Sequence, residues 1–143
     1  MNNLVIYTDG AYSPLRDQGG VGIVILDENK KILEYSNMYK NTTNNQMELL
    51  AVIIAFNLIK EPKESIVIYT DSQYIIGCAT LGWKRKKNTK LWEAYDNQYN
   101  RVSKLCSNIT FKHVKGHQNK NFSEDSKWNN YVDNLAVSAT KLI

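Results

Sequence analysis

The sequence contains little cysteine and lacks the long apolar runs of membrane proteins. Its two cysteines, Cys78 and Cys106, lie in apolar surroundings without CxxC spacing, which argues against a disulfide framework and against a zinc site. No apolar stretch approaches the roughly 18 to 20 residues that a membrane span needs, and the first residues lack the basic start of a secretion signal. We therefore expect a soluble, cytoplasmic protein with reduced thiols and no membrane partner.

The length and net charge of the chain indicate its domain number and the kind of partner that suits it. With 143 residues and a hydrophobic fraction of 43%, residues 1–143 are expected to form a single domain around one core, with a monomer as the default state. Eighteen Lys and Arg residues against fourteen Asp and Glu residues give a formal net charge of +4. This balance suits a polyanionic partner such as nucleic acid, although many proteins share it.

The hydrophobic pattern changes from strand-like to helical near residue 43. The first forty residues are β-branched, apolar or loosely alternating, as expected for three strands. Helical periods then alternate with short apolar strands, an order that implies parallel strands and a mixed α/β sheet with helices on its faces. The expected strands are 4–8, 20–27, 31–39, 66–70 and 109–114, and the expected helices run from 43 to a stop at Pro62, around 74–78, over 91–105 and around 128–139.

One pentapeptide, Val-Ile-Tyr-Thr-Asp, occurs twice, at residues 5–9 and 67–71. Each copy resembles a buried strand that ends in an aspartate. Two parallel strands with equivalent ends would place Asp9 and Asp71 at one carboxyl edge of the sheet, where open α/β folds hold their ligands. Each aspartate alone could simply open a turn. Only the pairing favours an acidic site.

Two further acids lie beside apolar helix faces. Glu48 stands near the start of the helix that follows Thr43, next to the apolar position Met47, and Asp133 stands next to the apolar position Val132. Carboxylates brought within about 4 Å of one another repel by roughly 4 kcal/mol per pair at an effective dielectric of 20, so such a cluster needs cations. Ligand sets made only of oxygen select magnesium or manganese rather than zinc.

Six short motifs follow one another along the chain: Tyr-Thr-Asp-Gly-Ala at 7–11, Gly-Gly-Val-Gly at 19–22, Thr-Thr-Asn-Asn-Gln-Met-Glu-Leu at 42–49, Tyr-Thr-Asp-Ser-Gln at 69–73, Val-Lys-Gly-His at 114–117, and the segment 129–136 around Asp133. The glycine motif marks backbone that is flexible or closely approached, at a strand entry or beside a ligand. Each motif alone is weak. Together, in this order and spacing, they make nearly the whole chain similar to the ribonuclease H family, type 1.

This resemblance implies a five-stranded mixed sheet flanked by helices, with the first, fourth and fifth strands parallel. It also implies that Asp9, Glu48, Asp71 and Asp133 bind two Mg²⁺ ions, with Mn²⁺ as a substitute. In the family, the acid matching Asp9 contacts both ions, the acid matching Asp133 helps to hold the ion that activates water, and those matching Glu48 and Asp71 serve the ion at the leaving oxygen. The implied enzyme is an endonuclease that hydrolyses the RNA strand of RNA·DNA hybrids and leaves 5′-phosphate and 3′-hydroxyl ends.

The resemblance assigns further roles around these acids. His117 would carry a proton or assist product release, although a histidine in a polar loop can also be a plain surface residue. Asn45 and Gln73 would lie at the minor groove beside the scissile strand, and Thr43 and Asn44 near a phosphate of the DNA strand. Without the resemblance, the two asparagines are read as helix-capping residues.

The densest positive charge lies at residues 83–90. This segment is expected to contact the nucleic-acid backbone and to make the affinity depend on salt, the alternative being a merely solvated loop. Many family members carry a longer basic protrusion at this place, so the chain has a shortened form of it. The residues expected to bind the substrate here are Trp83, Lys84, Arg85, Lys86 and Lys87.

Three other interpretations share these motifs. A catalytically silent relative would bind hybrids without cutting them, a resolvase or transposase core would use the same acids on DNA, and a reverse transcriptase polyprotein would contain a similar domain. The four acids and the run Thr-Asn-Asn-Gln-Met-Glu at 43–48 favour the hybrid-cutting enzyme, and Met1 favours a free-standing protein. Residues 11–18 and the lengthened stretch 117–133 depart from the family pattern, so we assign no contacts to the former and leave the position of His117 open.

Overall fold

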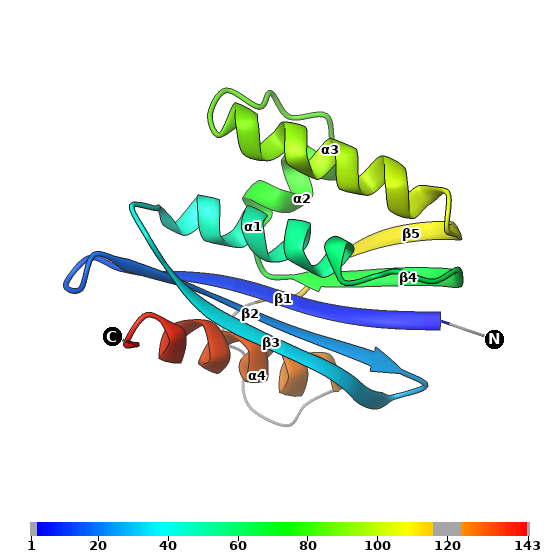
Figure 1. Ribbon diagram of the computed structural model, residues 1–143, viewed down its shortest axis with the longest axis horizontal. Coiled ribbons are helices and arrows are strands. Elements are labelled where there is room, and N and C mark those ends of the chain that lie inside the picture. The colour runs from blue at the N-terminus through cyan, green and yellow to red at the C-terminus, as the bar shows by residue number, and fades with distance from the viewer. Residues whose placement is uncertain (1–2, 116–123, 143) are drawn as a thin grey trace.

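The chain forms a five-stranded sheet with helices on both faces (Figure 1). The computed structural model describes residues 3–115 and 124–142. β1 is antiparallel to β2 and β2 to β3, whereas β4 is parallel to β1 and β5 to β4. The predicted mixed sheet with parallel first, fourth and fifth strands is therefore confirmed. The strands, in the spatial order β3-β2-β1-β4-β5, are β1 (Asn3–Ser13), β2 (Gln18–Asp27), β3 (Lys30–Lys40), β4 (Lys63–Thr70) and β5 (Cys106–His113).

Three helices lie above the sheet in Figure 1 and one lies below it. Those above are α1 (Asn44–Asn57), α2 (Gln73–Thr80) and α3 (Thr89–Ser103), and the one below is α4 (Glu124–Ala139). The main core fills the space between the sheet, α1 and α3. A smaller apolar cluster lies between the sheet and α4. None of these four described helices is long and apolar enough to cross a membrane.

Helix α1 begins where the sequence predicts. The Thr43 side chain accepts a hydrogen bond from the Gln46 amide, and the Gln46 side chain accepts one from the Thr43 amide, which completes a capping box. A capping box of Asn45 and Glu48 would also fit the sequence, and it would have used the Glu48 side chain as a cap. Because Thr43 and Gln46 form the cap, the Glu48 side chain serves another purpose. The helix ends with its cap at Leu58, before the predicted stop at Pro62.

The strands are longer than their apolar runs predict, as β1 and β5 illustrate. β1 continues to Ser13 because its backbone pairs with β2 as far as Gln18. β5 starts at Cys106 rather than at Ile109, since Cys106 already pairs with Lys63 of β4. The additional length comes from pairing with a neighbouring strand, which the local hydrophobic pattern does not contain.

The Gly-Gly-Val-Gly motif lies inside β2, on the part of the strand that α4 covers. A Cβ atom on Gly22 would collide with the carbonyl oxygen of Val132, and a Cβ atom on Gly20 would collide with that of Ala136. The two glycines therefore let the helix backbone approach the sheet closely. The close approach that the sequence predicts is present, and the approaching group is a helix.

A methyl group added at Gly22 tests this contact. We expect Gly22→Ala to lower the free energy of unfolding by about 1–3 kcal/mol, the usual cost of overpacking, because the colliding atom belongs to helix backbone. Gly19→Ala is the matched control, since its methyl group meets the side chains of Thr42 and Met47, which can rotate away. Urea denaturation of both variants measures the difference, and equal losses would contradict the importance of the α4 contact.

Candidate active site

Asp9 and Asp71 are brought together by the parallel register of β1 and β4. The two copies of the repeated pentapeptide lie opposite each other, with Val5 paired to Val67 and Tyr7 to Tyr69. Both aspartates therefore come at the same edge of the sheet, as the repeat predicts. Asp9 is only 3% exposed, and Asp71 is half-buried.

Glu48 reaches the same edge from α1. A Cβ atom on Gly10 would collide with the backbone of Met47 and Glu48, so α1 passes directly over β1 at this glycine. The Gly10 amide donates to Oε1 of Glu48 at 2.7 Å and to Oδ1 of Asp9 at 2.9 Å. One backbone N–H group thus holds two carboxylates close together.

The carboxylates of Asp9, Glu48 and Asp71 form a cluster with the chemistry of a metal site. One oxygen atom from each lies within 4.8 Å of the others. Burial raises the pKa of Asp9 far above its ordinary value, and the charges of Glu48 and Asp71 raise it further. Burial and the charge of Asp71 also raise the pKa of Glu48. Like charges in such a place need bound protons or cations, and three carboxylate oxygens suit Mg²⁺ or Mn²⁺.

Asp133 approaches the cluster from α4. Among the described residues, it is not part of the 4.8 Å group, but its hydrogen bond adds to burial in raising the pKa of Asp9. Its charge adds, after burial, to the raised pKa of Glu48. Asp133 follows Val132, whose carbonyl oxygen lies against Gly22, and Gly22 is paired with Asp9. The contact between α4 and β2 therefore places the fourth predicted acid beside the other three.

The sequence profile of the ribonuclease H family matches residues 1–141 of the chain. The chain belongs to the ribonuclease H family. A ribonuclease H of Trichodesmium erythraeum is 38% identical over 148 residues, which cover 96% of this chain and 88% of the relative. A ribonuclease H of Desulforamulus reducens is 35% identical over 150 residues, with coverage of 99% and 89%.

Solved structures of the family have the same fold. LC11-RNase H1, determined in complex with an RNA/DNA hybrid, superimposes with a TM-score of 0.72 at 25% identity, and the match covers 96% of each chain. The protease-reverse transcriptase of prototype foamy virus superimposes with a TM-score of 0.80 at 26% identity. That match covers 100% of this chain and 21% of the viral one, so the same fold also occurs within a much longer protein.

The residues that the family resemblance assigns to the hybrid lie at helix starts next to the acids. Thr43 caps α1, Asn44 and Asn45 are its first residues, and Gln73 is the first residue of α2; all four are exposed. The amino terminus of a helix favours anionic groups such as phosphates. His117 lies outside the described residues.

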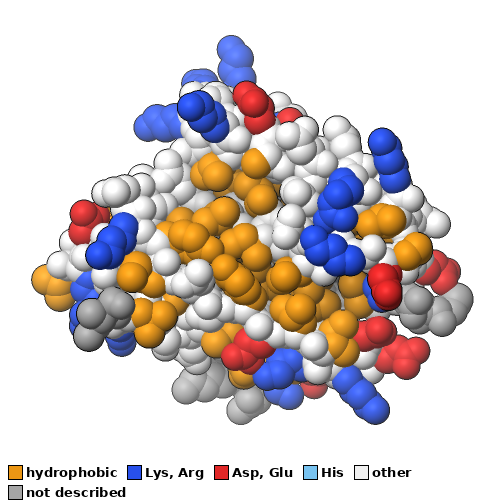
Figure 2. Space-filling view, in the orientation of Figure 1, with side chains coloured by type: hydrophobic (Ala, Val, Ile, Leu, Met, Phe, Trp, Pro, Cys, Tyr) orange, Lys and Arg blue, Asp and Glu red, His pale blue; other side chains and the backbone are white. Residues whose placement is uncertain are grey.

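The basic segment, residues 83–87, belongs to the loop between α2 and α3, where Figure 2 shows Lys and Arg side chains projecting at the top of the molecule. Lys84, Lys86 and Lys87 are exposed. Arg85 instead binds the protein itself. Its Nη1 donates to both carboxylate oxygens of Asp96 at 2.9 Å, and its guanidinium lies 4.2 Å from the centre of the Trp92 ring. Arg85 therefore attaches the segment to α3, and the three lysines carry its free charge.

Two contacts around this segment were not predicted. Asn88, in the left-handed region with φ of 61°, accepts the Gln46 amide at 3.1 Å and donates to the Tyr74 hydroxyl at 3.0 Å. Trp83 packs so tightly on α2 that a Cβ atom on Gly77 would enter its ring. His113 lines a cavity of about 220 Å³ together with Gln73, Ile76, Leu81 and Trp83.

Removing one charge from the acidic cluster should stabilise the metal-free protein. A carboxyl group whose pKa is raised by folding holds more protons in the folded state than in the unfolded state between the two pKa values. The free energy of unfolding therefore falls as the pH rises through that window, which for Glu48 starts near 4.5. In EDTA, we expect wild-type stability to fall between about pH 5 and pH 8, and Asp9→Asn to be more stable than wild type by roughly 0.5–2 kcal/mol at the upper end.

Urea denaturation at several pH values measures this effect. Asp27→Asn is the matched control, because Asp27 lies at the far end of β2, paired with Leu4. Mg²⁺ should reduce the pH dependence of the wild-type protein, since a cation replaces the protons. An Asp9→Asn protein that is less stable than wild type in EDTA at every pH would contradict the repulsion.

Proposed function

We propose that the chain is an endoribonuclease that hydrolyses the RNA strand of RNA·DNA hybrids and leaves 5′-phosphate and 3′-hydroxyl ends. The observation that carries the proposal is the cluster of Asp9, Glu48 and Asp71 at one sheet edge in a member of the ribonuclease H family. The hybrid bound to LC11-RNase H1 supports the same substrate class for this chain.

The four acids would hold two Mg²⁺ ions, with Mn²⁺ as a substitute. When bound, these ions neutralise charge on the scissile phosphate and lower the pKa of the attacking water. Asp9 would contact both ions, Glu48 and Asp71 the ion at the leaving oxygen, and Asp133 the ion at the attacking water. The protein's own part is positioning, because the Gly10 amide already holds Asp9 and Glu48 together without substrate.

His117 is proposed to assist by carrying a proton at the leaving oxygen or by promoting product release. An imidazole suits this task, because its ordinary pKa lies near neutral pH and it can both accept and donate a proton.

Hybrid specificity requires contacts that sense 2′-hydroxyl groups on one strand and deoxyribose on the other. Asn45 and Gln73 are proposed to make these contacts in the minor groove, because their exposed amides flank the acids from α1 and α2. Thr43 and Asn44 would bind a phosphate of the DNA strand at the start of α1.

The basic segment would bind the nucleic-acid backbone further from the acids. Lys84, Lys86 and Lys87 would contact phosphates, and the exposed ring of Trp83 would pack against the same strand. Arg85 would act through its contacts with Asp96 and Trp92, which hold the segment in place.

The protein is further proposed to act as a monomer in the cytoplasm, with residues 1–143 forming one catalytic domain. All four acids come from elements of one chain, namely β1, α1, α4 and the end of β4. A second copy is therefore not needed to complete the site.

The first test is cleavage of matched RNA·DNA, RNA·RNA and DNA·DNA duplexes in Mg²⁺ and in EDTA. We expect RNA cleavage in the hybrid only, with EDTA abolishing it and Asp9→Asn reducing it by about 10³-fold or more, while hybrid binding persists. Asp27→Asn should cleave like the wild-type protein. Binding without cleavage would favour a silent module, and cleavage of the DNA duplex would favour a DNA nuclease on the same scaffold.

Replacing Lys84, Lys86 and Lys87 with alanine tests the basic segment. Because each phosphate contact releases counterions, the slope of log affinity against log salt concentration should become shallower by up to about 2–3. A matched control replaces the exposed Lys30, Lys60 and Lys104, which lie at the start of β3, between α1 and β4, and directly after α3. Fluorescence anisotropy with a labelled hybrid measures both slopes, and equal slopes in the two triple variants would show that the segment is only a solvated loop.

A further inference from the structure

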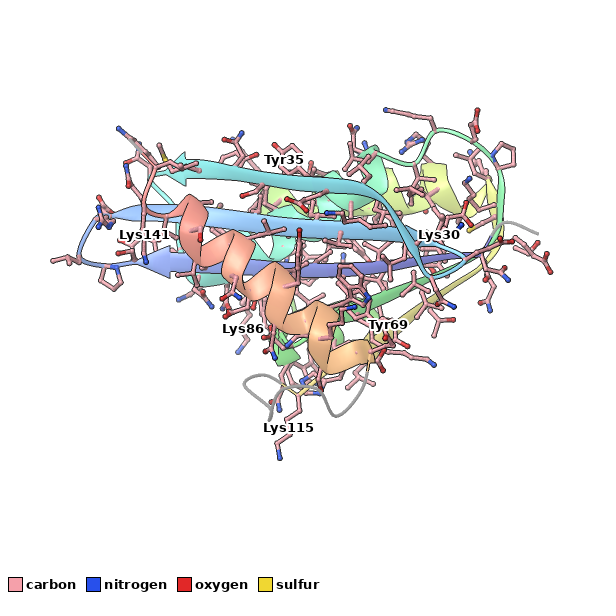
Figure 3. The ribbon with its side chains drawn as sticks, turned by 90° about the horizontal axis from the view of Figure 1, so that it is seen from below. Lys30, Tyr35, Tyr69, Lys86, Lys115 and Lys141 are labelled. Carbon is pink, nitrogen blue, oxygen red and sulfur yellow. The ribbon has the colours of Figure 1, made fainter. Side chains whose placement is uncertain are left out.

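The two tyrosines of the repeated pentapeptide form a stacked pair next to the start of α4. Tyr7 and Tyr69 lie opposite each other in the register of β1 and β4, with ring centres 4.7 Å apart and planes 12° apart. Side chains alternate along a strand, so Tyr7 points to the same face of the sheet as Asp9. Figure 3 shows Tyr69 beside the first turn of α4.

Asp125 joins this pair to α4. The Tyr7 hydroxyl donates to Oδ1 of Asp125 at 2.6 Å, across 118 positions of sequence. Burial, followed by the charge of Asp125 and a hydrogen bond with it, raises the pKa of Tyr69. The Asp125 carboxylate therefore accepts the Tyr7 hydroxyl and lies near the ring that stacks on Tyr7. We call Tyr7, Tyr69 and Asp125 the tyrosine–aspartate clasp.

Helix α4 needs such an attachment more than α1 does. α1 is apolar on nearly all sides and buries most of its length in the main core, which holds Glu48 in place. The buried positions of α4 are Val132, the alanines 136 and 139, and the polar Ser126 and Asn129. Its backbone lies against Gly20 and Gly22 of β2, so this part of the contact contains no strand side chains.

The clasp holds the start of α4. If α4 tilted at this end, Asp133 further along the helix would move. Asp133 follows Asp125 by eight residues, which corresponds to about 12 Å along the helix axis. It lies at the margin of the acidic cluster, so its distance from Asp9 depends directly on where α4 sits. A misplacement of about 1 Å at a reacting site can reduce a rate by roughly 10²-fold.

We propose that Asp125 is a positioning residue, a role that rests on the proposed two-metal function. By accepting the hydroxyl of Tyr7, whose ring stacks on Tyr69, it fixes the start of α4 on β1 and β4 and thereby sets the position of Asp133 beside Asp9. The tyrosine and aspartate positions of the repeat then contribute to the same site. The aspartates supply metal ligands, and the tyrosines attach the helix that carries another ligand.

Two substitutions test the clasp. Tyr7→Phe keeps the stacked ring and the Asp125 charge but removes the donor, and Asp125→Asn removes the charge with little change of shape. For both variants, we expect the Mg²⁺ concentration for half-maximal hybrid cleavage to rise roughly tenfold, in line with the loss of groups that orient metal ligands, while KM for the hybrid stays nearly constant. A shift with Asp125→Asn but not with Tyr7→Phe would show a simple charge effect and overturn the proposal.

Tyr131→Phe is the matched control. It also removes a tyrosine hydroxyl from α4, but this one contacts Glu34 and Lys31 of β3. We expect its stability to fall as much as that of Tyr7→Phe, while its Mg²⁺ dependence stays that of the wild-type protein. If Tyr131→Phe shifted the Mg²⁺ dependence equally, the clasp would contribute only to general stability, and the positioning role would be wrong.

A second measurement does not depend on activity. In a Mg²⁺ titration followed by NMR, the Gly10 amide reports on Asp9 and Glu48, and the Asp133 amide reports on α4. In Tyr7→Phe, the midpoint at Asp133 should rise roughly tenfold, with that at Gly10 unchanged; an unchanged midpoint at Asp133 would refute the positioning role. A wild-type protein whose Asp133 amide does not respond to Mg²⁺, or which leaves the hybrid intact, would instead refute the proposed function.

Discussion

The repulsion between carboxylates held at one sheet edge is the constraint on which the rest of the structure depends. Asp9, Glu48 and Asp71 approach within 4.8 Å of one another in a place where water is largely excluded. Their charges favour separation in the absence of a cation. The elements that carry them must therefore be held by interactions made elsewhere, and these are the parallel pairing of β1 with β4 and the contact of α1 with Gly10.

The two helices that bring acids to the sheet are held in different ways. α1 is surrounded by apolar contacts, so Glu48 cannot move without disturbing the main core. α4 packs on a small cluster through Val132 and depends on polar contacts at its start, where Asp125 binds Tyr7. The least firmly held acid is thus Asp133. This arrangement matches a site in which three acids form a fixed group and α4 brings the fourth to it.

Much of this arrangement could be predicted from the sequence, because the decisive signals are local. The repeated pentapeptide predicted the pairing of Asp9 with Asp71, and the glycine motif predicted a close backbone approach. The helical period from residue 43 predicted the start of α1, which the capping box of Thr43 and Gln46 forms. Each signal is a short pattern whose physical meaning does not require knowledge of the fold.

The unpredicted contacts all depend on partners that only the fold brings together. The contact of Asp125 appears only when the sheet places the Tyr7 hydroxyl beside the start of α4. Arg85 reads as part of a basic run, and its internal role appears only when α3 presents Asp96 and Trp92 on one face. Charge patterns predict how much charge a segment carries, but they do not predict which charges are already neutralised.

The internal role of Arg85 also changes how the short basic segment can act. Its Nη1 atom donates to both oxygens of Asp96, and its guanidinium lies 4.2 Å from the centre of the Trp92 ring, a contact that suits a planar group better than the ammonium of lysine. One positive charge is thereby lost to the substrate. The neighbouring lysines are displayed from a loop attached to α3, and for the proposed phosphate contacts such an attachment would lower the conformational entropy lost on binding. The segment thus combines an internal anchor at Arg85 with three exposed lysines.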